Sequence, residues 1–491
     1  MTDNPLPPPT EDELFYPNGI DGETGQPLIP SLTCEEVASL ARSGESDTPW
    51  LAALEAYGSQ VTLLGPPPGS DDLAEAGWAY VCHQDEAQEV RDALEALAEH
   101  RRVKIKKTRP DRVERVKSFV YDGKQSVEDW LADKGVGIGD YKPAKVPYYL
   151  LLAGSPERIP FEWSLALDLD YAVGRIHFDH ASEYKRYVQS VIDYEGGQAP
   201  PRAKEAVFFG TCHKFDKSTQ MSARQLLDPL ADGIPEDDEP GVAVGRGFAT
   251  RKLRGKDATR VALQSVLAPP DGAPPPAFLF TATHGVGFKP AKREDQLARQ
   301  GALVCQDWGG SGPFRPEYTF AAADVPAAAG IHGLIAFFFA CYSAGTPTLD
   351  AFWSKKGALP PAVAEKPFLA ALPKALLSHG GGGALACIGH TERAWSSSFY
   401  ASKVGSIVQP FQFAIQWILE GKPVGYAASP FLERYSRFGH DLNGLLKLVQ
   451  WELPVDDKQL ARVWTRYHDA GGYLVVGDPA VRLRVEDWAK T

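Results

Sequence analysis

Two residues that could act as a nucleophile and a base each follow an apolar segment. His284 comes directly after segment 277–283, and Cys341 comes directly after segment 334–340. A thiolate attacks carbonyl carbons, and an imidazole within hydrogen-bond reach can take up and return the proton. Gly285 follows the histidine, and its N–H can approach a substrate carbonyl because glycine carries no side chain. The pattern predicts acyl transfer by a Cys–His pair, with the N–H groups of Gly285 and Cys341 binding the oxyanion.

The two apolar segments are expected to bring these residues together. Continuous apolar runs of this kind are typical of strands that are buried on both faces of a parallel sheet. In open α/β sheets, ligands bind outside the carboxyl ends of the strands. The chain between His284 and Cys341 is long enough for a crossover and a loop. We therefore expect the two strands to be neighbours and the two side chains to share one crevice.

The remaining pattern predicts an α/β fold. Strands are expected over 148–153, 171–178, 206–212, 383–389 and 473–476, and helices over 86–100, 183–195, 400–420 and 444–452. Strands that alternate with helices indicate βαβ units and a mainly parallel sheet. The basic segment 101–107 alternates in polarity and predicts an edge strand. Long loops over 214–247, 286–324 and 344–366 are expected to wall a substrate cleft.

Composition excludes several classes of protein. The 491 residues exceed the size at which a single core usually stops growing. We therefore expect two units: an N-terminal α/β region of unknown role over 1–145 and a larger domain over 146–491. The net charge of −12 argues against a nucleic-acid partner. No apolar run reaches membrane-spanning length and no signal peptide is evident. We expect a cytoplasmic protein without a membrane partner.

Other cysteines and histidines offer competing interpretations. The six cysteines lack metal-ligand spacing, which indicates reduced thiols and no metal site. Cys387 and His390 lie three residues apart on one strand and face opposite sides, which disfavours direct pairing. Cys212 and His213 are adjacent in sequence, with no glycine after the histidine. Cys341 could also be a buried thiol with no role in chemistry.

The order of these motifs resembles a known group of enzymes. His-Gly after one strand and Ala-Cys after a later one resemble the caspase-like cysteine peptidases. The flanking segments 170–176 and 477–483, with Glu183, are more similar to the gingipain branch (C25-like). The resemblance covers about 148–483 and leaves the first 145 residues uncovered. It implies a caspase-like α/β/α sandwich with a mainly parallel central sheet and a smaller N-terminal region.

The resemblance implies a cysteine endopeptidase that forms an acyl-enzyme on Cys341. Its substrate would be a protein or peptide, and neither a metal nor an organic cofactor is needed. The preference for the residue before the cleaved bond (P1) stays open, because segment 218–222 lacks the charge that related enzymes place near that pocket. Asp216 and Asp307 are acidic candidates for that pocket, and Gln220 is a neutral one. His390, Arg393 and Trp395 are expected to line the rim of the cleft.

Two other functions are compatible with the same sequence. A catalytically silent caspase-like scaffold could bind a protein partner through the same cleft. The region 1–145 would then be a recognition module, and in an active enzyme it could bind a regulatory partner. A nucleotide-binding α/β protein lacks support, because the glycine-rich segment 135–139 is not followed by the Lys-Ser/Thr of a phosphate loop.

Overall fold

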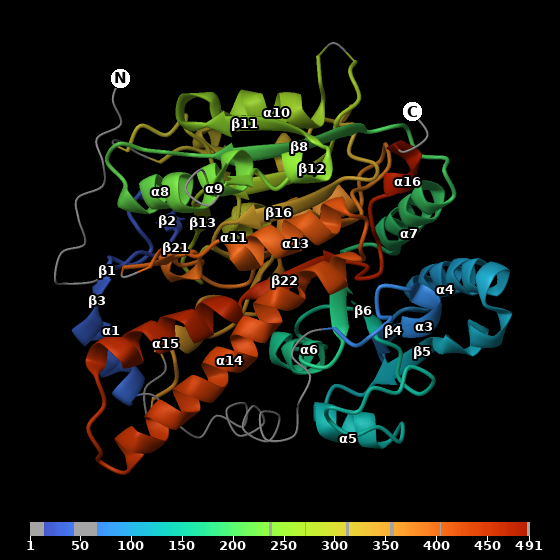
Figure 1. Ribbon diagram of the computed structural model, residues 1–491, viewed down its shortest axis with the longest axis horizontal. Coiled ribbons are helices and arrows are strands. Elements are labelled where there is room, and N and C mark those ends of the chain that lie inside the picture. The colour runs from blue at the N-terminus through green and yellow to red at the C-terminus, as the bar shows by residue number, and fades with distance from the viewer. Residues whose placement is uncertain are drawn as a thin grey trace.

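A ten-stranded sheet forms the centre of the computed structural model (Figure 1). The structure describes residues 14–43, 66–234, 238–270, 272–310, 314–353, 358–402 and 404–488. In spatial order the strands are β11 (Ala249–Arg254), β8 (Ala203–Gly210), β12 (Pro276–Ala282), β16 (Ile335–Phe339), β19 (Ala386–His390), β22 (Tyr473–Gly477), β7 (Ala172–Ile176), β6 (Tyr149–Ala153), β4 (Trp78–His83) and β5 (Val116–Tyr121). The predicted α/β class and central sheet are confirmed.

The sheet consists of two parallel halves that run in opposite directions. Neighbouring strands are parallel throughout, except at the antiparallel junction between β19 and β22. β12 pairs in parallel with both β8 and β16. The carboxyl ends of β8, β12, β16 and β19 therefore meet at one edge of the sheet, where the predicted dyad lies. The sheet is mainly parallel, as the sequence predicts.

Successive residues of a strand point to opposite faces of the sheet and pack against different helices. On β4, Trp78 and Tyr80 pack in one core cluster with α4 (Gln88–Thr108) and α7 (Ala181–Glu195). Ala79 and Val81 pack in another cluster with α5 (Val127–Ala132) and α6 (Phe161–Asp168). This period of two places one helical layer on each face. The arrangement is the predicted α/β/α sandwich.

Long helices cover the sheet near its junction. α13 (Gln409–Leu419) places Phe411 against Phe280 of β12 and Phe337 of β16. α14 (Val424–Gln450) and α15 (Asp457–Ala470) run side by side, and α1 (Cys34–Ser43) packs against α15 (Figure 1). The predicted helix over 400–420 begins later, because residues 400–401 and 405–406 form a short hairpin. No helix among the described residues has the length and apolar character to span a membrane.

The basic segment 101–107 is helical, so its prediction as an edge strand was wrong. It continues α4, whose residues Leu94, Leu97, Arg101 and Ile105 are buried on one face. Arginine and lysine are good helix formers. The alternation of charge in the segment reflects the polar side of a helix, with Arg101 turned inward to Glu195 and Asp478.

The sheet continues across residue 145. β4 pairs with β6 in parallel, with Trp78 opposite Tyr149, and β5 adds the next strand. The first 145 residues therefore supply two strands to the central sheet. The division at 145 as a boundary between units of function stays a prediction.

A second sheet joins the N-terminal segment to the strand that follows His284. β2 (Gly19–Asp21) pairs in parallel with β13 (Gly285–Gly287), which pairs with β14 (Leu303–Val304) and then β15 (Thr319–Phe320). β1 (Leu14–Phe15) pairs with β3 (Leu32–Thr33). Figure 1 shows β2 beside β13, although the two strands are far apart in the sequence. The turn-like sequence of residues 17–22 gives no sign of this strand.

Candidate active site

His284 and Cys341 leave adjacent strands at the same level. β12 and β16 pair in register, with Ala282 opposite Phe339, and the N–H of Thr283 donates to the carbonyl of Phe339 at 3.2 Å. The expectation that these strands are neighbours is confirmed. A side chain on Gly285 is excluded, because a Cβ there would lie 1.9 Å from the carbonyl oxygen of Cys341. Glycine at 285 therefore lets the histidine strand touch the cysteine backbone.

Asp216 orients the histidine. Its Oδ2 lies 2.8 Å from Nε2 of His284 and also accepts the N–H of Thr219, because Asp216 caps α8 (Lys217–Ser222). Burial alone would raise the pKa of Asp216, but the charge and hydrogen bond of His284, with the bonds from Thr219, lower it far below its usual value. Asp216 is therefore a carboxylate. The Nδ1 atom of His284 is buried and has no hydrogen-bond partner among the described residues.

Cys341 is fully enclosed. Its side chain is 0% exposed, and Sγ accepts the N–H of Ala394 at 3.3 Å. Burial raises the pKa of Cys341 to about 12, although the N–H groups of Ala394 and Asn18 and the charge of Arg393 act in the opposite direction. In this state the thiol is protonated at neutral pH.

The peptide that encloses the thiol is the chain's own N-terminal segment. The N–H of Asn18 donates to the carbonyl of Ala394 at 2.9 Å, and the N–H of Ser396 donates to the carbonyl of Tyr16 at 3.0 Å. Tyr16 to Asn18 thus runs antiparallel to 394–396. On its other side, the carbonyl of Asn18 accepts the N–H of Gly285 at 3.3 Å. This N–H is one of the two predicted oxyanion donors.

The side chains of this segment are fixed as closely as its backbone. Asn18 is 3% exposed, and its Nδ2 donates to the carbonyl of Thr283 at 2.7 Å. A Cβ on Gly19 would lie 3.0 Å from Sγ of Cys341 and 2.6 Å from Leu28. The carbonyl of Pro17 accepts the hydroxyl of Ser218 at 2.9 Å. The segment therefore fills the cleft beside the thiol.

Hydrogen bonds hold the turn after Cys341. Tyr342 has a left-handed backbone with φ of 57°, and its N–H donates to the carbonyl of Glu392 at 2.8 Å. The Ser343 hydroxyl oxygen accepts the N–H of His390 at 3.0 Å. A non-glycine residue in this region of φ is uncommon and carries strain. The strained turn presents Cys341 beyond the end of its strand.

The predicted substrate-binding residues lie in different places. Gln220 is on α8 and donates to the carbonyls of His213 and Lys214. Asp307 is exposed and accepts the N–H of Arg260 at 2.8 Å. Among the described residues, neither side chain forms a hydrogen bond with the segment that fills the cleft.

His390 lies beneath the cleft instead of on its rim. It is 0% exposed, and its Nε2 lies 2.8 Å from the carbonyl of Asp469. Trp395 is buried against Phe352, but its backbone pairs with Pro17 and therefore borders the cleft. Of the predicted set, the structure brings Trp395 next to the dyad through its main chain.

Cys387 and His213 of the competing interpretations are buried in surroundings that are typical of residues with a structural role. Cys387 is buried in the central strand β19, and burial raises the pKa of its thiol. His213 is 1% exposed and contacts Gln306 and Trp308. No group of three or more His, Cys, Asp or Glu residues with metal-site geometry occurs in the described part of the chain.

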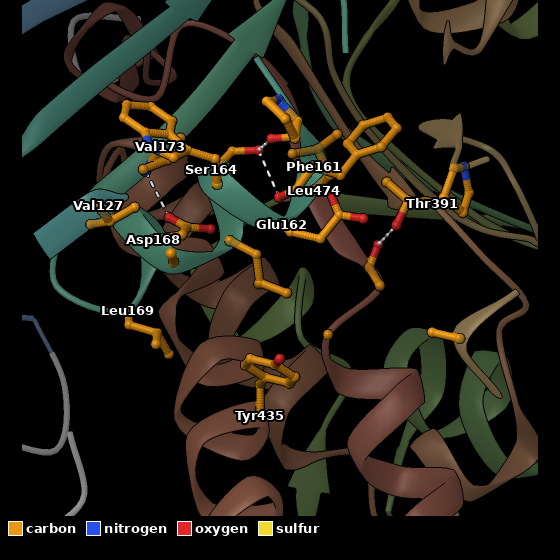
Figure 2. A pocket seen from close by; sticks show the side chains of 18 of the residues that line it. Val127, Phe161, Glu162, Ser164, Asp168, Leu169, Val173, Thr391, Tyr435 and Leu474 are labelled. Atoms are coloured by element: carbon orange, nitrogen blue, oxygen red, sulfur yellow. Dashed lines mark hydrogen bonds between the residues drawn. The ribbon is translucent and has the colours of Figure 1, made fainter. Parts of the chain in front are cut away.

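An apolar cavity of about 840 Å³ lies apart from the thiol, between α6, α14 and α15 (Figure 2). Phe161, Val173 and Leu474 line it, and Asp168 points into the same region. Burial raises the pKa of Asp168 to about 8, although the N–H of Val173 lowers it. Cys341 and His284 do not line this cavity, so the peptide-filled cleft is the candidate active site.

Comparison with solved structures gives four matches, and the three described below have low sequence identity to this chain. No family model and no curated protein matches the sequence. A solved structure described as a protease has a TM-score of 0.47 and 12% identity over 83% of this chain and 78% of that chain. The Arg-specific cysteine proteinase gingipain R has a TM-score of 0.44 and 12% identity over 84% and 79%. The complex of the pro- and mature domains of Porphyromonas gingivalis RgpB has 0.41 and 13% over 83% and 80%.

Proposed function

We propose that this protein is a cysteine endopeptidase that acts through Cys341 and His284. The observation that carries the proposal is the placement of a peptide carbonyl, that of Asn18, on the N–H of Gly285 next to the Cys341 thiol. An N–H donor at a reacting carbonyl stabilises the oxyanion of the tetrahedral intermediate. The binding of an extended peptide beside Cys341, with its carbonyl on this N–H, supports the proposal.

The residues divide the work as follows. Sγ of Cys341 attacks the carbonyl carbon, and His284 accepts the thiol proton and returns it to the leaving amine. Asp216 holds Nε2 of His284 at 2.8 Å, which leaves Nδ1 for the proton transfer. Gly285 donates to the oxyanion, and the backbone of 394–396 binds the peptide as an added strand. Water then hydrolyses the acyl-enzyme.

The full burial of Cys341 favours a second candidate, a silent scaffold that binds a partner through this cleft. The two candidates differ in thiol reactivity once the N-terminal segment leaves. Gly19→Leu should unseat the segment, because the new side chain would collide with Leu28 and the thiol. Gly380→Leu is the matched control, since Gly380 is exposed and a Cβ there meets nothing within 4 Å.

The test is cleavage of a peptide library, with a covalent peptide electrophile as a second readout. We expect the Gly19→Leu protein to cleave peptides and to be labelled on Cys341, and the same variant with Cys341→Ala to do neither. If Gly19→Leu is folded but neither cleaves nor reacts, the scaffold is the correct interpretation.

A further inference from the structure

The bond between Asn18 and Gly19 occupies the cleft as a substrate bond would. We propose that the protein cleaves its own chain between Asn18 and Gly19, and that the same pocket selects asparagine before the cleaved bond in other substrates. This inference rests on the proposed peptidase function and names its substrate class. It follows from three features of the bound segment: its backbone register, the contact of the Asn18 side chain, and the close approach at Gly19.

The backbone register singles out one bond. The Asn18 carbonyl is the one that accepts the N–H of Gly285, and the N–H of Asn18 donates both to Ala394 and towards Sγ of Cys341. One residue further along the chain, the position of a Gly19 Cβ lies 3.0 Å from Sγ. The thiol is therefore next to the peptide unit that joins Asn18 to Gly19. The antiparallel pairing with 394–396 fixes the direction of the chain, so Asn18 is on the acyl side.

The side chain of Asn18 is bound by a group that requires a donor. The carbonyl of Thr283 accepts its Nδ2 at 2.7 Å in a buried setting. An aspartate would place a carboxylate against that carbonyl and would leave this buried acceptor without a donor, which disfavours its binding. A basic residue would find no free carboxylate at Asp216, which is already paired with His284. Asparagine supplies the donor that this carbonyl requires, while its Oδ1 is buried and has no hydrogen-bond partner among the described residues.

Glycine is required on the other side of the bond. A Cβ on residue 19 would lie 2.6 Å from Leu28 and 3.0 Å from the sulfur. The close approach of the thiol to the peptide thus depends on the missing side chain. The sequence contains a second Asn–Gly pair, Asn443–Gly444, within α14. That pair has the same two residues without the cleft and serves as an internal control.

The reaction balances with water as the co-reactant. Sγ of Cys341 loses its proton to His284 and bonds to the carbonyl carbon of Asn18. The bond from that carbon to the Gly19 nitrogen breaks, and His284 gives the proton to this nitrogen. Water then cleaves the thioester, which restores the thiol and leaves a carboxylate on Asn18. The products are residues 1–18 and a chain that begins at Gly19, with the cleft opposite 394–396 vacated.

The experiment follows the full-length protein by intact mass and N-terminal sequencing during incubation between pH 7 and 9. We expect a new N-terminus at Gly19, no cut at Asn443–Gly444, and at least a hundredfold slower reaction for Cys341→Ala. Asn18→Asp should slow the cut at least tenfold, whereas Asn443→Gln should leave it unchanged. Once the segment has left, a synthetic peptide of residues 14–21 should be cleaved after asparagine, and its aspartate analogue at least tenfold more slowly.

The outcomes separate this inference from the proposed function. A full-length chain that stays intact, or is cut at another bond, overturns the inference. If Gly19→Leu still cleaves library peptides or reacts at Cys341, the proposed peptidase function stands although the self-cleavage inference does not. Cleavage after Asn18 that persists in Cys341→Ala would assign the cut to spontaneous Asn–Gly chemistry and also overturn the inference.

Discussion

The carboxylate of Asp216 lies 2.8 Å from Nε2 of His284, and both residues lie at the edge of the sheet where Cys341 follows its strand. Each of the three residues follows a strand of the same half-sheet: β8 precedes Asp216, β12 precedes His284 and β16 precedes Cys341. The shared edge of the parallel strands thus assembles residues that are far apart in the sequence. The geometry assigns Asp216 to orienting the imidazole.

Asp216→Asn should reduce turnover with little loss of stability. Asparagine caps helices as well as aspartate does, so α8 should stay folded. It cannot hold the imidazole as a carboxylate does, and the corresponding change in a serine triad costs about 10⁴ in kcat. We expect a loss of about tenfold or more in peptide cleavage, measured in the Gly19→Leu background. A melting temperature equal to that of Gly19→Leu alone is the control, and full activity would contradict the assignment.

Alkylation of Cys341 in the full-length, uncut chain should be slow and strongly dependent on pH. The thiolate is the reactive form, and with a pKa raised to about 12 its fraction increases about tenfold per pH unit between 7 and 9. Iodoacetamide labelling followed by peptide mapping would measure this rate separately from that of the other cysteines. The Asn18→Asp protein retains the segment and provides uncut material. In Gly19→Leu the reaction should be faster at pH 7, and equal rates would show that the segment does not shield the thiol.

Asp168→Asn should stabilise the protein more at pH 8.5 than at pH 5. The folded-state pKa of Asp168 is raised to about 8, so folding favours its protonated form. That contribution is complete below the unfolded pKa of about 4 and is lost as the pH rises towards 8. Asparagine keeps an acceptor for the N–H of Val173 and has no charge to bury. We expect a melting temperature roughly 2 °C higher at pH 8.5 and a smaller gain at pH 5.

Arg101→Met should destabilise the fold strongly. The guanidinium is 0% exposed and binds Glu195 and Asp478, so its loss leaves the buried Asp478 without its ion-pair partner and Glu195 with only Lys104 and His100. Breaking such a pair costs about 3–5 kcal/mol. Arg102→Met, one residue along α4, removes surface pairs with Glu95 and Glu99 and should cost at most about 1 kcal/mol. Denaturant unfolding of both variants would measure the difference, and equal midpoints would contradict the buried role.

The sequence predicts those parts of the fold whose signal is local. The apolar runs before His284 and Cys341 identify buried strands, since few other structures bury so many consecutive residues. Segment 101–107 was mispredicted because charge alternation on a short scale resembles a strand, whereas the burial of Arg101 depends on Glu195 from a distant helix. The pairing of β2 with β13 could not be predicted from residues 17–22, because Pro, Asn and Gly there satisfy turn patterns equally well.

The same limit applies to the site. The sequence offers Asp216 only as an acidic candidate for the P1 pocket, since its contact with His284 depends on a residue that lies much later in the chain. The side chains of Gln220 and His390 are bound to main-chain carbonyls, of His213 and of Asp469. A hydrogen-bond partner cannot be assigned from composition alone.

The antiparallel junction in the central sheet has a consequence for synthesis of the protein. β22 is the last of the sheet's described strands along the chain, yet it lies between β19 and β7. During translation, the half-sheet that carries the dyad and the half-sheet that begins with β4 have no strand between them until residue 477 has been made. Domains generally fold as units during synthesis, the N-terminal ones first. This sheet, however, cannot become continuous before β22 in its middle has been made. The continuous sheet can therefore form only late in synthesis, when β22 joins the half-sheet that carries His284 and Cys341 to the other half.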